Sequence, residues 1–181
     1  MGIGLDPRAP SQKEKRMSIT VTTERRAPLL ARVAETLTAH SIDWLRTSLG
    51  LVILGFGALK YFPGASPAED LVQRTTDVLT LGVVTGTAAS VGTAVLETFI
   101  GLTLLTGVGL RLGLVAMAGW LVGILTPVVL FAGDMFPDGL PTLEAQYVLK
   151  DVILAAAAAV VAARVLGARY VFPAEDRTVE P

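Results

Sequence analysis

The sequence predicts an all-α integral membrane protein in which four helices cross the bilayer as a bundle. Its 181 residues are 52% hydrophobic and 17% charged, whereas about a quarter of a soluble chain is charged. The charge is also unevenly placed, because eleven of the first 35 residues are charged but the run 112–133 carries no charge. About 20 apolar residues cross a bilayer core, and a soluble domain of this size cannot enclose several such helices.

The chain divides into a membrane domain between two polar ends. We expect a disordered cytoplasmic tail over 1–27, a single four-span domain over 28–168 and a polar C-terminal tail over 169–181. The predicted spans are, in order, about 41–62 with Ser41 as N-cap, about 90–108, 112–132 and about 142–167. A tight turn at 107–111, with two glycines, joins the second and third spans.

Two further segments have helical spacing but differ from the spans. Between Pro28 and the first span, apolar residues fall at helical intervals, which predicts either an amphipathic helix at the membrane surface or an extension of span one. From Ser66, the sequence Ser-Pro-Ala-Glu predicts a capping box with Pro at the first helical position. The helix that it opens, to about Leu81, is too charged to span, so we expect it on the outer surface between spans one and two.

The orientation follows from the basic residues, which favour the cytoplasmic side. Seven Lys and Arg residues precede the first span, Arg111 lies in the turn between spans two and three, and Arg164 and Arg169 lie near the end of span four. In the two other loops Arg74 is the only basic residue, and the remaining charged residues are acidic. Both termini are therefore predicted to be cytoplasmic. The chain lacks Asn, is rich in Ala, Val, Gly and Arg and has only four Lys, a bias typical of a GC-rich bacterial genome, so we expect the membrane to be the inner membrane of a bacterium.

Composition excludes several classes of function. The chain has no Cys and a single His, His40, so it cannot form a disulfide, an iron–sulfur cluster, a zinc–thiolate site or a bis-histidine haem. A net charge of −1 gives no field for nucleic acid. We therefore predict no intrinsic cofactor, no metal site and no nucleic-acid partner.

Ionisable side chains inside the predicted spans are the candidate functional residues, because burying a charge in a bilayer is costly. Arg46 lies near the cytoplasmic end of span one and is predicted to be a structural anchor. Glu97 in span two and the adjacent Lys150 and Asp151 in span four should reach a similar depth, with Lys60 slightly nearer the outer surface.

These four residues, with Tyr147 one helical turn before Lys150, form the predicted cluster. One interpretation is structural, with Glu97 paired to Lys150 and Lys60 paired to Asp151 to hold the helices in register. The other is an outward-facing pocket for a polar or quinone-like ligand.

The same residues carry a resemblance to a known family. The segments Phe56-Gly-Ala-Leu-Lys-Tyr-Phe62, Ser66-Pro67, Leu96-Glu97 with Ile100-Gly101, and Tyr147-Val-Leu-Lys-Asp151 resemble the DoxX-like superfamily. The nearest branch contains the reactive-chlorine-resistance membrane protein of enteric bacteria. The resemblance covers about 45–166 and implies a four-helix membrane bundle in a redox-related setting. The basic N-terminal segment and the lack of Cys depart from that pattern and argue against a direct redox role.

Three functions are compatible with these observations. The first is an accessory or ligand-binding subunit of a redox or oxidative-stress system, with a bound quinone or a membrane or redox partner protein handling electrons. The second is the membrane subunit of a quinone-linked oxidoreductase. The third, a small ion or anion transporter, is disfavoured because no paired halves are evident. The partners expected are the lipid bilayer, a membrane or redox protein, and a second copy of the chain in a homo-oligomer.

Overall fold

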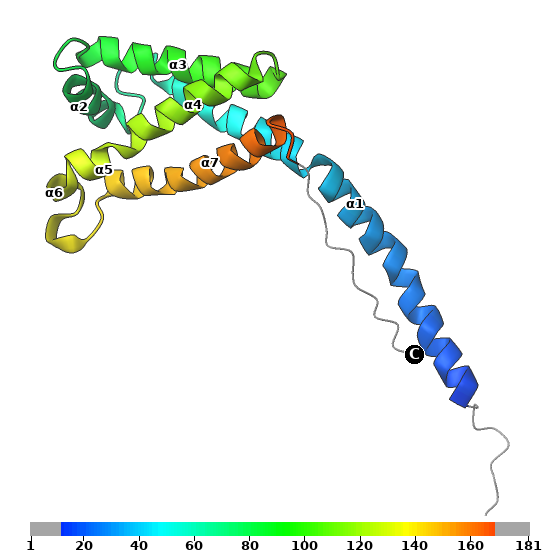
Figure 1. The fold of residues 1–181 in the computed structure, drawn as a ribbon. Coiled ribbons are helices and arrows are strands. Elements are labelled where there is room, and N and C mark those ends of the chain that lie inside the picture. The colour runs from blue at the N-terminus through cyan, green and yellow to red at the C-terminus, as the bar shows by residue number, and fades with distance from the viewer. Residues whose placement is uncertain (1–11, 169–181) are drawn as a thin grey trace, which may run out of the picture. The chain divides into compact units, whose positions relative to one another are not determined.

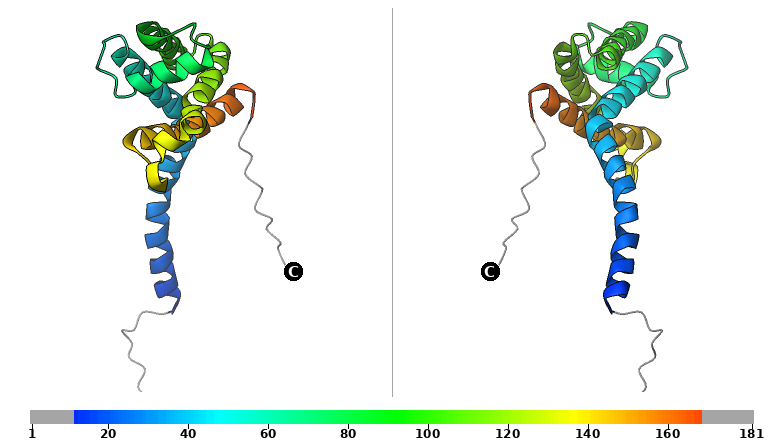
Figure 2. Two further views of the ribbon diagram at one scale, coloured as in Figure 1. Left: turned by 90° about the vertical axis from the view of Figure 1, so that its left-hand side faces the viewer. Right: turned by 90° about the vertical axis from the view of Figure 1, so that its right-hand side faces the viewer.

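The structure, a computed structural model, describes residues 12–168, and every regular element in them is a helix (Figures 1 and 2). The chain separates into two compact units, one ending at Ser41 and the other beginning at Ile42. The predicted polar tail over 169–181 and the first eleven residues lie outside the described residues.

Helix α1 runs without interruption from Gln12 to Leu59, which differs from the sequence-based expectation at its start. Residues 12–27 were predicted to be disordered and Ser41 to be an N-cap, but both lie inside this helix. Gln, Lys, Glu and Arg are good helix formers even where no apolar face is evident. Two alternatives were predicted for the segment after Pro28. In the structure this segment is continuous with the helix of the first predicted span, which agrees with the second alternative, an extension of that span.

Three helical stretches among the described residues are long and apolar enough to cross a membrane: Leu29–Leu59, Gly86–Thr106 and Leu110–Leu130. They correspond to the first three predicted spans. A further long helix, α7 (Leu143–Val165), begins where the fourth span was predicted, and its N-cap Thr142 accepts a hydrogen bond from the Ala145 N–H. Helix α7 has 23 residues, which is about 34 Å of helix.

The predicted tight turn joins helix α3 (Gly86–Thr106) to helix α4 (Leu110–Leu125). Gly107 and Gly109 both adopt positive φ angles, of 76° and 66°. Glycine takes up this left-handed conformation without the steric penalty of a side chain. The two helices can therefore reverse direction over three residues.

The predicted third span is broken near its end. Helix α4 stops at Leu125, and the short helices α5 (Pro127–Leu130) and α6 (Ala132–Met135) follow, with the 3-10 turn η1 (Pro137–Gly139). Proline has no N–H and its ring clashes with the preceding helical turn, so Pro127 begins a new helix instead of continuing α4.

Helix α2 (Glu69–Leu79) is the predicted charged helix, but the predicted capping box is wrong. Its N-cap is Ala68, which makes no side-chain hydrogen bond. The Glu69 carboxylate instead accepts a hydrogen bond from the Gly64 N–H at 2.6 Å, because the helix begins two residues later than a Ser66 cap requires. The side chain of Ser66 is buried.

Four long helices share one apolar core in the second unit. Its buried members come from α1, α3, α4 and α7: Leu49, Ile53, Ile100, Leu104, Met117, Trp120, Leu121, Ala158 and Val161. A second, smaller core joins α2, α6 and α7 through Leu71, Met135, Ala145 and Val148. Helix α7 therefore packs into the same core as the three apolar stretches.

Small residues allow the helices to approach closely. A Cβ atom on Gly50 of α1 would lie 3.1 Å from the Gly101 carbonyl oxygen of α3, and a Cβ on Gly101 would lie 2.8 Å from the Leu54 Cβ. Between α3 and α4, a Cβ on Gly113 would overlap the Thr103 side chain, at 1.9 Å from Oγ1. These contacts bring side chains from different helices into one site.

Candidate functional site

The second unit contains a cavity of about 540 Å³ that is lined by all five residues of the predicted cluster. These are Lys60, Glu97, Tyr147, Lys150 and Asp151. Most of the remaining lining is apolar and comes from α1, α2, α3, α4 and α7. The sequence predicted that these residues lie at a similar depth in the membrane, and in the structure they line the same cavity.

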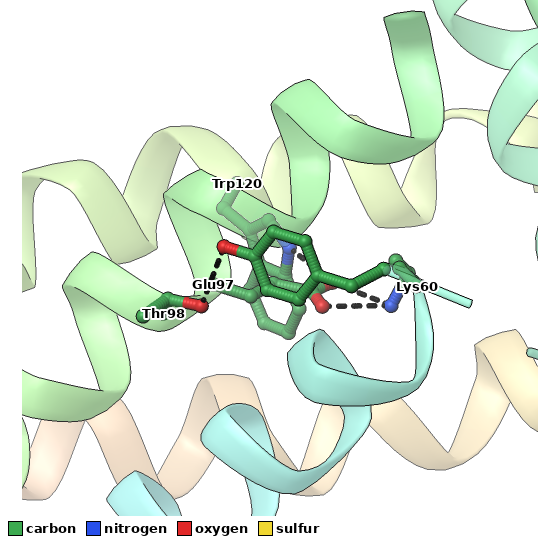
Figure 3. Close-up of polar contacts among 5 residues, drawn as sticks. Lys60, Glu97, Thr98 and Trp120 are labelled. Atoms are coloured by element: carbon green, nitrogen blue, oxygen red, sulfur yellow. Dashed lines mark hydrogen bonds and ion pairs between the residues drawn. The ribbon is translucent and has the colours of Figure 1, made fainter. Parts of the chain in front are cut away.

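At one side of the cavity Lys60 and Glu97 form a buried ion pair (Figure 3). Lys60 Nζ donates hydrogen bonds to both carboxylate oxygens of Glu97, at 2.8 Å to Oε1 and 2.7 Å to Oε2. Trp120 Nε1 donates a third, to Oε1 at 3.0 Å. The Glu97 side chain is 1% exposed and that of Lys60 is 7% exposed, so the negative charge is fully compensated inside the protein.

The predicted partners were therefore wrong. Glu97 pairs with Lys60 and not with Lys150, and Lys60 does not pair with Asp151. The physical reason is the chain path after α1, which ends at Leu59 and turns, so that Lys60 lies in the turn and its ammonium reaches across to α3. Helical phase alone could not predict a side chain that leaves the helix.

The position of this pair depends on close packing between α1 and α3. A Cβ atom added to Gly57 would lie 2.9 Å from the Glu97 Cβ and 3.3 Å from Oε2. Next to Lys60, the Tyr61 hydroxyl lies 3.1 Å from the Thr98 hydroxyl oxygen. Two consecutive residues after α1 thus contact two consecutive residues of α3.

Lys150 has a different environment. Its ammonium nitrogen lies 3.7 Å from the centre of the Tyr147 ring and 5.2 Å from that of Phe56, both within the range of a cation–π interaction. Among the described residues, Lys150 makes no hydrogen bond and no ion pair within 4 Å. Lys150 is an exposed residue that also lines the cavity, whose lining is otherwise largely apolar.

Asp151 and Tyr147 complete the predicted cluster on α7. Asp151 is half-buried and lines the cavity, but no ion pair within 4 Å joins it to another described residue. Tyr147 presents its ring to Lys150. Helix α7 therefore contributes one cation, one carboxyl group and one phenol to a cavity wall that is otherwise largely apolar.

Arg46 lies outside the cavity, and its contacts are with the end of α3. Its guanidinium donates to the backbone carbonyls of Leu104 and Leu105 in the last turn of α3. The final carbonyls of a helix lack intrahelical partners and attract cations. Asp43, one turn earlier, lies 3.9 Å from the Arg46 Nε.

Sequence reasoning missed two aromatic residues of the site, Trp120 and Phe56. The signal for Trp120 was its indole N–H, which needs a hydrogen-bond acceptor when it lies in an apolar helix, and Glu97 is a buried acceptor. Phe56 lies one helical turn before Lys60 on α1, but nothing in the sequence indicated that its ring would meet Lys150 from α7.

Comparisons of the chain with protein-family models, with curated proteins and with solved structures find no match. The resemblance to the DoxX-like superfamily accordingly stays a prediction. Among the side chains that the structure describes, those of residues 29–168, no three His, Cys, Asp or Glu are grouped so that they could hold a metal ion.

Proposed function

We propose that this chain is a four-span, DoxX-like protein of the bacterial inner membrane that binds a small amphipathic ligand, a quinone, within its helices. Both termini lie in the cytoplasm, and the protein acts as an accessory subunit of a redox or oxidative-stress system. Three apolar helical stretches and the packing of α7 into their common core support the four spans.

The observation that carries the ligand proposal is the position of Lys150. Lys150 lines a mostly apolar cavity, next to the rings of Tyr147 and Phe56, and makes no ion pair within 4 Å or hydrogen bond with another described residue. A quinone has a flat apolar ring and carbonyl oxygens that accept hydrogen bonds, so the residues present fit it. Ligand pockets are commonly about 300–1,000 Å³ with a few placed polar groups, and this cavity has both properties.

The roles of the chain's own residues follow from their contacts. Lys150 would hold the polar head, Phe56 and Tyr147 would flank the ring, and Trp120 would form part of the wall. Lys60 and Glu97 neutralise each other and so close one side of the cavity without a free charge. A bound quinone would supply electron transfer. The chain has no Cys and therefore no thiol of its own for that chemistry.

Tryptophan fluorescence provides the test, because the chain has two Trp residues and only Trp120 lines the cavity. In the Trp44→Phe variant, reconstituted in nanodiscs, a short-chain ubiquinone should quench Trp120 fluorescence to a saturating level. Lys150→Met should weaken binding about 10–100-fold, the range for loss of a charged hydrogen bond. Arg111→Met, which removes a positive charge outside the cavity, should leave the affinity unchanged.

The result that would overturn the proposal is quenching that rises linearly with quinone concentration and is equal in all three proteins. Such behaviour would show only partition of the quinone into lipid. A further control keeps Trp44 and replaces Trp120 by Phe, and it should show no saturating component.

A further inference from the structure

The turn that joins α2 to α3 presents hydrophobic side chains outward. Leu81 is 91% exposed, more than any other large hydrophobic residue among those described, and Val83 is 82% exposed. Val78 and Leu79, in the last turn of α2, are exposed as well. Figure 1 shows this turn beyond the end of α2, where the chain enters α3. Residues 78–84, the apolar turn, therefore form a hydrophobic surface patch of the kind that marks an interaction site.

The backbone of the apolar turn holds Leu81 in a conformation that normally requires glycine. The Gly82 N–H donates to the Asp77 carbonyl at 2.8 Å. The Leu81 N–H donates to the Val78 carbonyl at 3.3 Å, and the two hydrogen bonds together form a Schellman motif. In this motif the residue after the C-cap, which is Thr80 here, has a positive φ and is usually Gly. Leu81 occupies that position with a φ of 54°. A Leu in this conformation is strained, so another interaction must offset the cost of placing it there.

The apolar turn is closed by its own hydrogen bonds. The Thr80 hydroxyl donates to the Thr76 carbonyl at 2.7 Å and accepts from the Val84 N–H at 3.0 Å. The Val83 N–H donates to the Thr80 carbonyl at 3.1 Å. These bonds satisfy backbone groups that have no helical partner at the end of α2. The outward position of Leu81 and Val83 is therefore set by the folded backbone of the turn.

The distribution of charge indicates which partner covers the apolar turn. The charged residues of α2 all lie between Glu69 and Asp77, and the sequence from Val78 to Leu96 contains none. The apolar stretch Gly86–Thr106, which is long enough to cross a membrane, begins three residues after Val83. The end of a spanning helix lies at the boundary of the hydrocarbon core. The apolar turn is therefore within a few residues of that boundary, and it has no charge that would oppose its entry into lipid.

We infer that the apolar turn inserts into the lipid bilayer and anchors the end of α2 to the membrane. Leu81 and Val83 lie among the acyl chains of the leaflet on that side, and their transfer out of water offsets the strain at Leu81. The charged part of α2, residues 69–77, remains at the level of the lipid headgroups and water. The inference concerns lipid contact outside the spans and does not rest on the identity of the ligand in the cavity.

The test measures the depth of the turn with a nitroxide spin label. The chain has no Cys, so Val83→Cys accepts a single label in the purified protein in nanodiscs. Paramagnetic resonance then compares the collision rates of the label with oxygen, which concentrates among acyl chains, and with a water-soluble nickel complex. Asp70→Cys, at an exposed position in the first turn of α2, is the matched control that should face water. We expect the ratio of oxygen to nickel collisions at Val83→Cys to exceed that at Asp70→Cys severalfold.

A second substitution tests the role of Leu81. Asn tolerates a positive φ but is polar, so Leu81→Asn in the Val83→Cys background should lower the ratio of oxygen to nickel collisions toward that of the Asp70→Cys control. Leu81→Met keeps an apolar side chain of similar volume and should leave the ratio close to that of the parent.

Three results would overturn the inference. A label at Val83→Cys that meets the nickel complex as often as the Asp70→Cys label would show that the turn lies in water. A label shielded from both oxygen and nickel would show that protein, a second copy of the chain, covers the turn in place of lipid. An unchanged ratio in Leu81→Asn would show that Leu81 does not anchor the turn. The measurement needs no quinone, so its failure is distinguishable from a failure of the proposed function.

Discussion

Lys60 binds both carboxylate oxygens of Glu97, with Nζ at 2.8 Å from Oε1 and 2.7 Å from Oε2. The two residues are 37 positions apart in the chain, and both side chains are buried. Removal of one partner of such a pair leaves the other charge buried and uncompensated, at a cost of about 3–5 kcal/mol, whereas removal of both is much milder.

The first prediction tests this pairing with a double-mutant cycle. Glu97→Gln and Lys60→Met should each lower the melting temperature in detergent, and the double variant should recover most of the loss. The same cycle between Glu97→Gln and Lys150→Met should show a much smaller coupling energy, because no ion pair joins those residues. Strong coupling of Glu97 to Lys150 instead would show that the pairing first expected from the sequence is the one present in the membrane.

The second prediction concerns the space that Gly57 leaves for Glu97. Gly57→Ala would place a Cβ atom 2.9 Å from the Glu97 Cβ, so we expect it to destabilise the protein by about 1–3 kcal/mol, the usual cost of overpacking. Thermal unfolding followed by circular dichroism measures the loss.

Gly55 is the matched control on the same helix. A Cβ atom added there meets nothing within 4 Å, so Gly55→Ala should be neutral or slightly stabilising, because alanine has the higher helix propensity. Equal effects of the two substitutions would contradict the close approach of α1 to Glu97.

The third prediction concerns the end of α3. Arg46→Gln removes the guanidinium that donates to the carbonyls of Leu104 and Leu105, and we expect a loss of about 1–3 kcal/mol. Arg111→Gln, at an exposed position five residues after the end of α3, should change the melting temperature little. An Arg46 variant as stable as the parent would show that its position reflects only snorkelling to the membrane surface.

The fourth prediction decides between three spans and four. Single Cys residues are introduced at Ser11, which lies outside the described residues, at Leu140, which is 71% exposed, and at Ala168. On intact cells, a membrane-impermeant thiol reagent should label only Leu140→Cys if α7 crosses the bilayer. Labelling at both Leu140→Cys and Ala168→Cys would show that α7 stays outside, and labelling at Ser11→Cys alone would reverse the orientation.

The sequence by itself determined that the chain is helical, that it has three apolar stretches of spanning length, and that a further helix starts near Thr142, which is the N-cap of α7. These properties depend on local composition, periodicity and caps, which are written in consecutive residues. The five residues predicted as a cluster from the sequence also line one cavity. Four of them could be predicted because ionisable side chains are rare within apolar spans, and Tyr147 lies one helical turn from Lys150.

Only the tertiary structure decided which of those charges meet. Lys60 leaves α1 in a turn and reaches Glu97, Lys150 lies against Phe56 and Tyr147, and Pro127 divides the third span into shorter helices. The choice of partners depends on where the chain turns and on contacts such as that of Gly57 with Glu97, where the absence of one methyl group lets two helices approach. Helical phase and depth constrain such contacts, but the partner of each charge is set by packing between segments far apart in the chain.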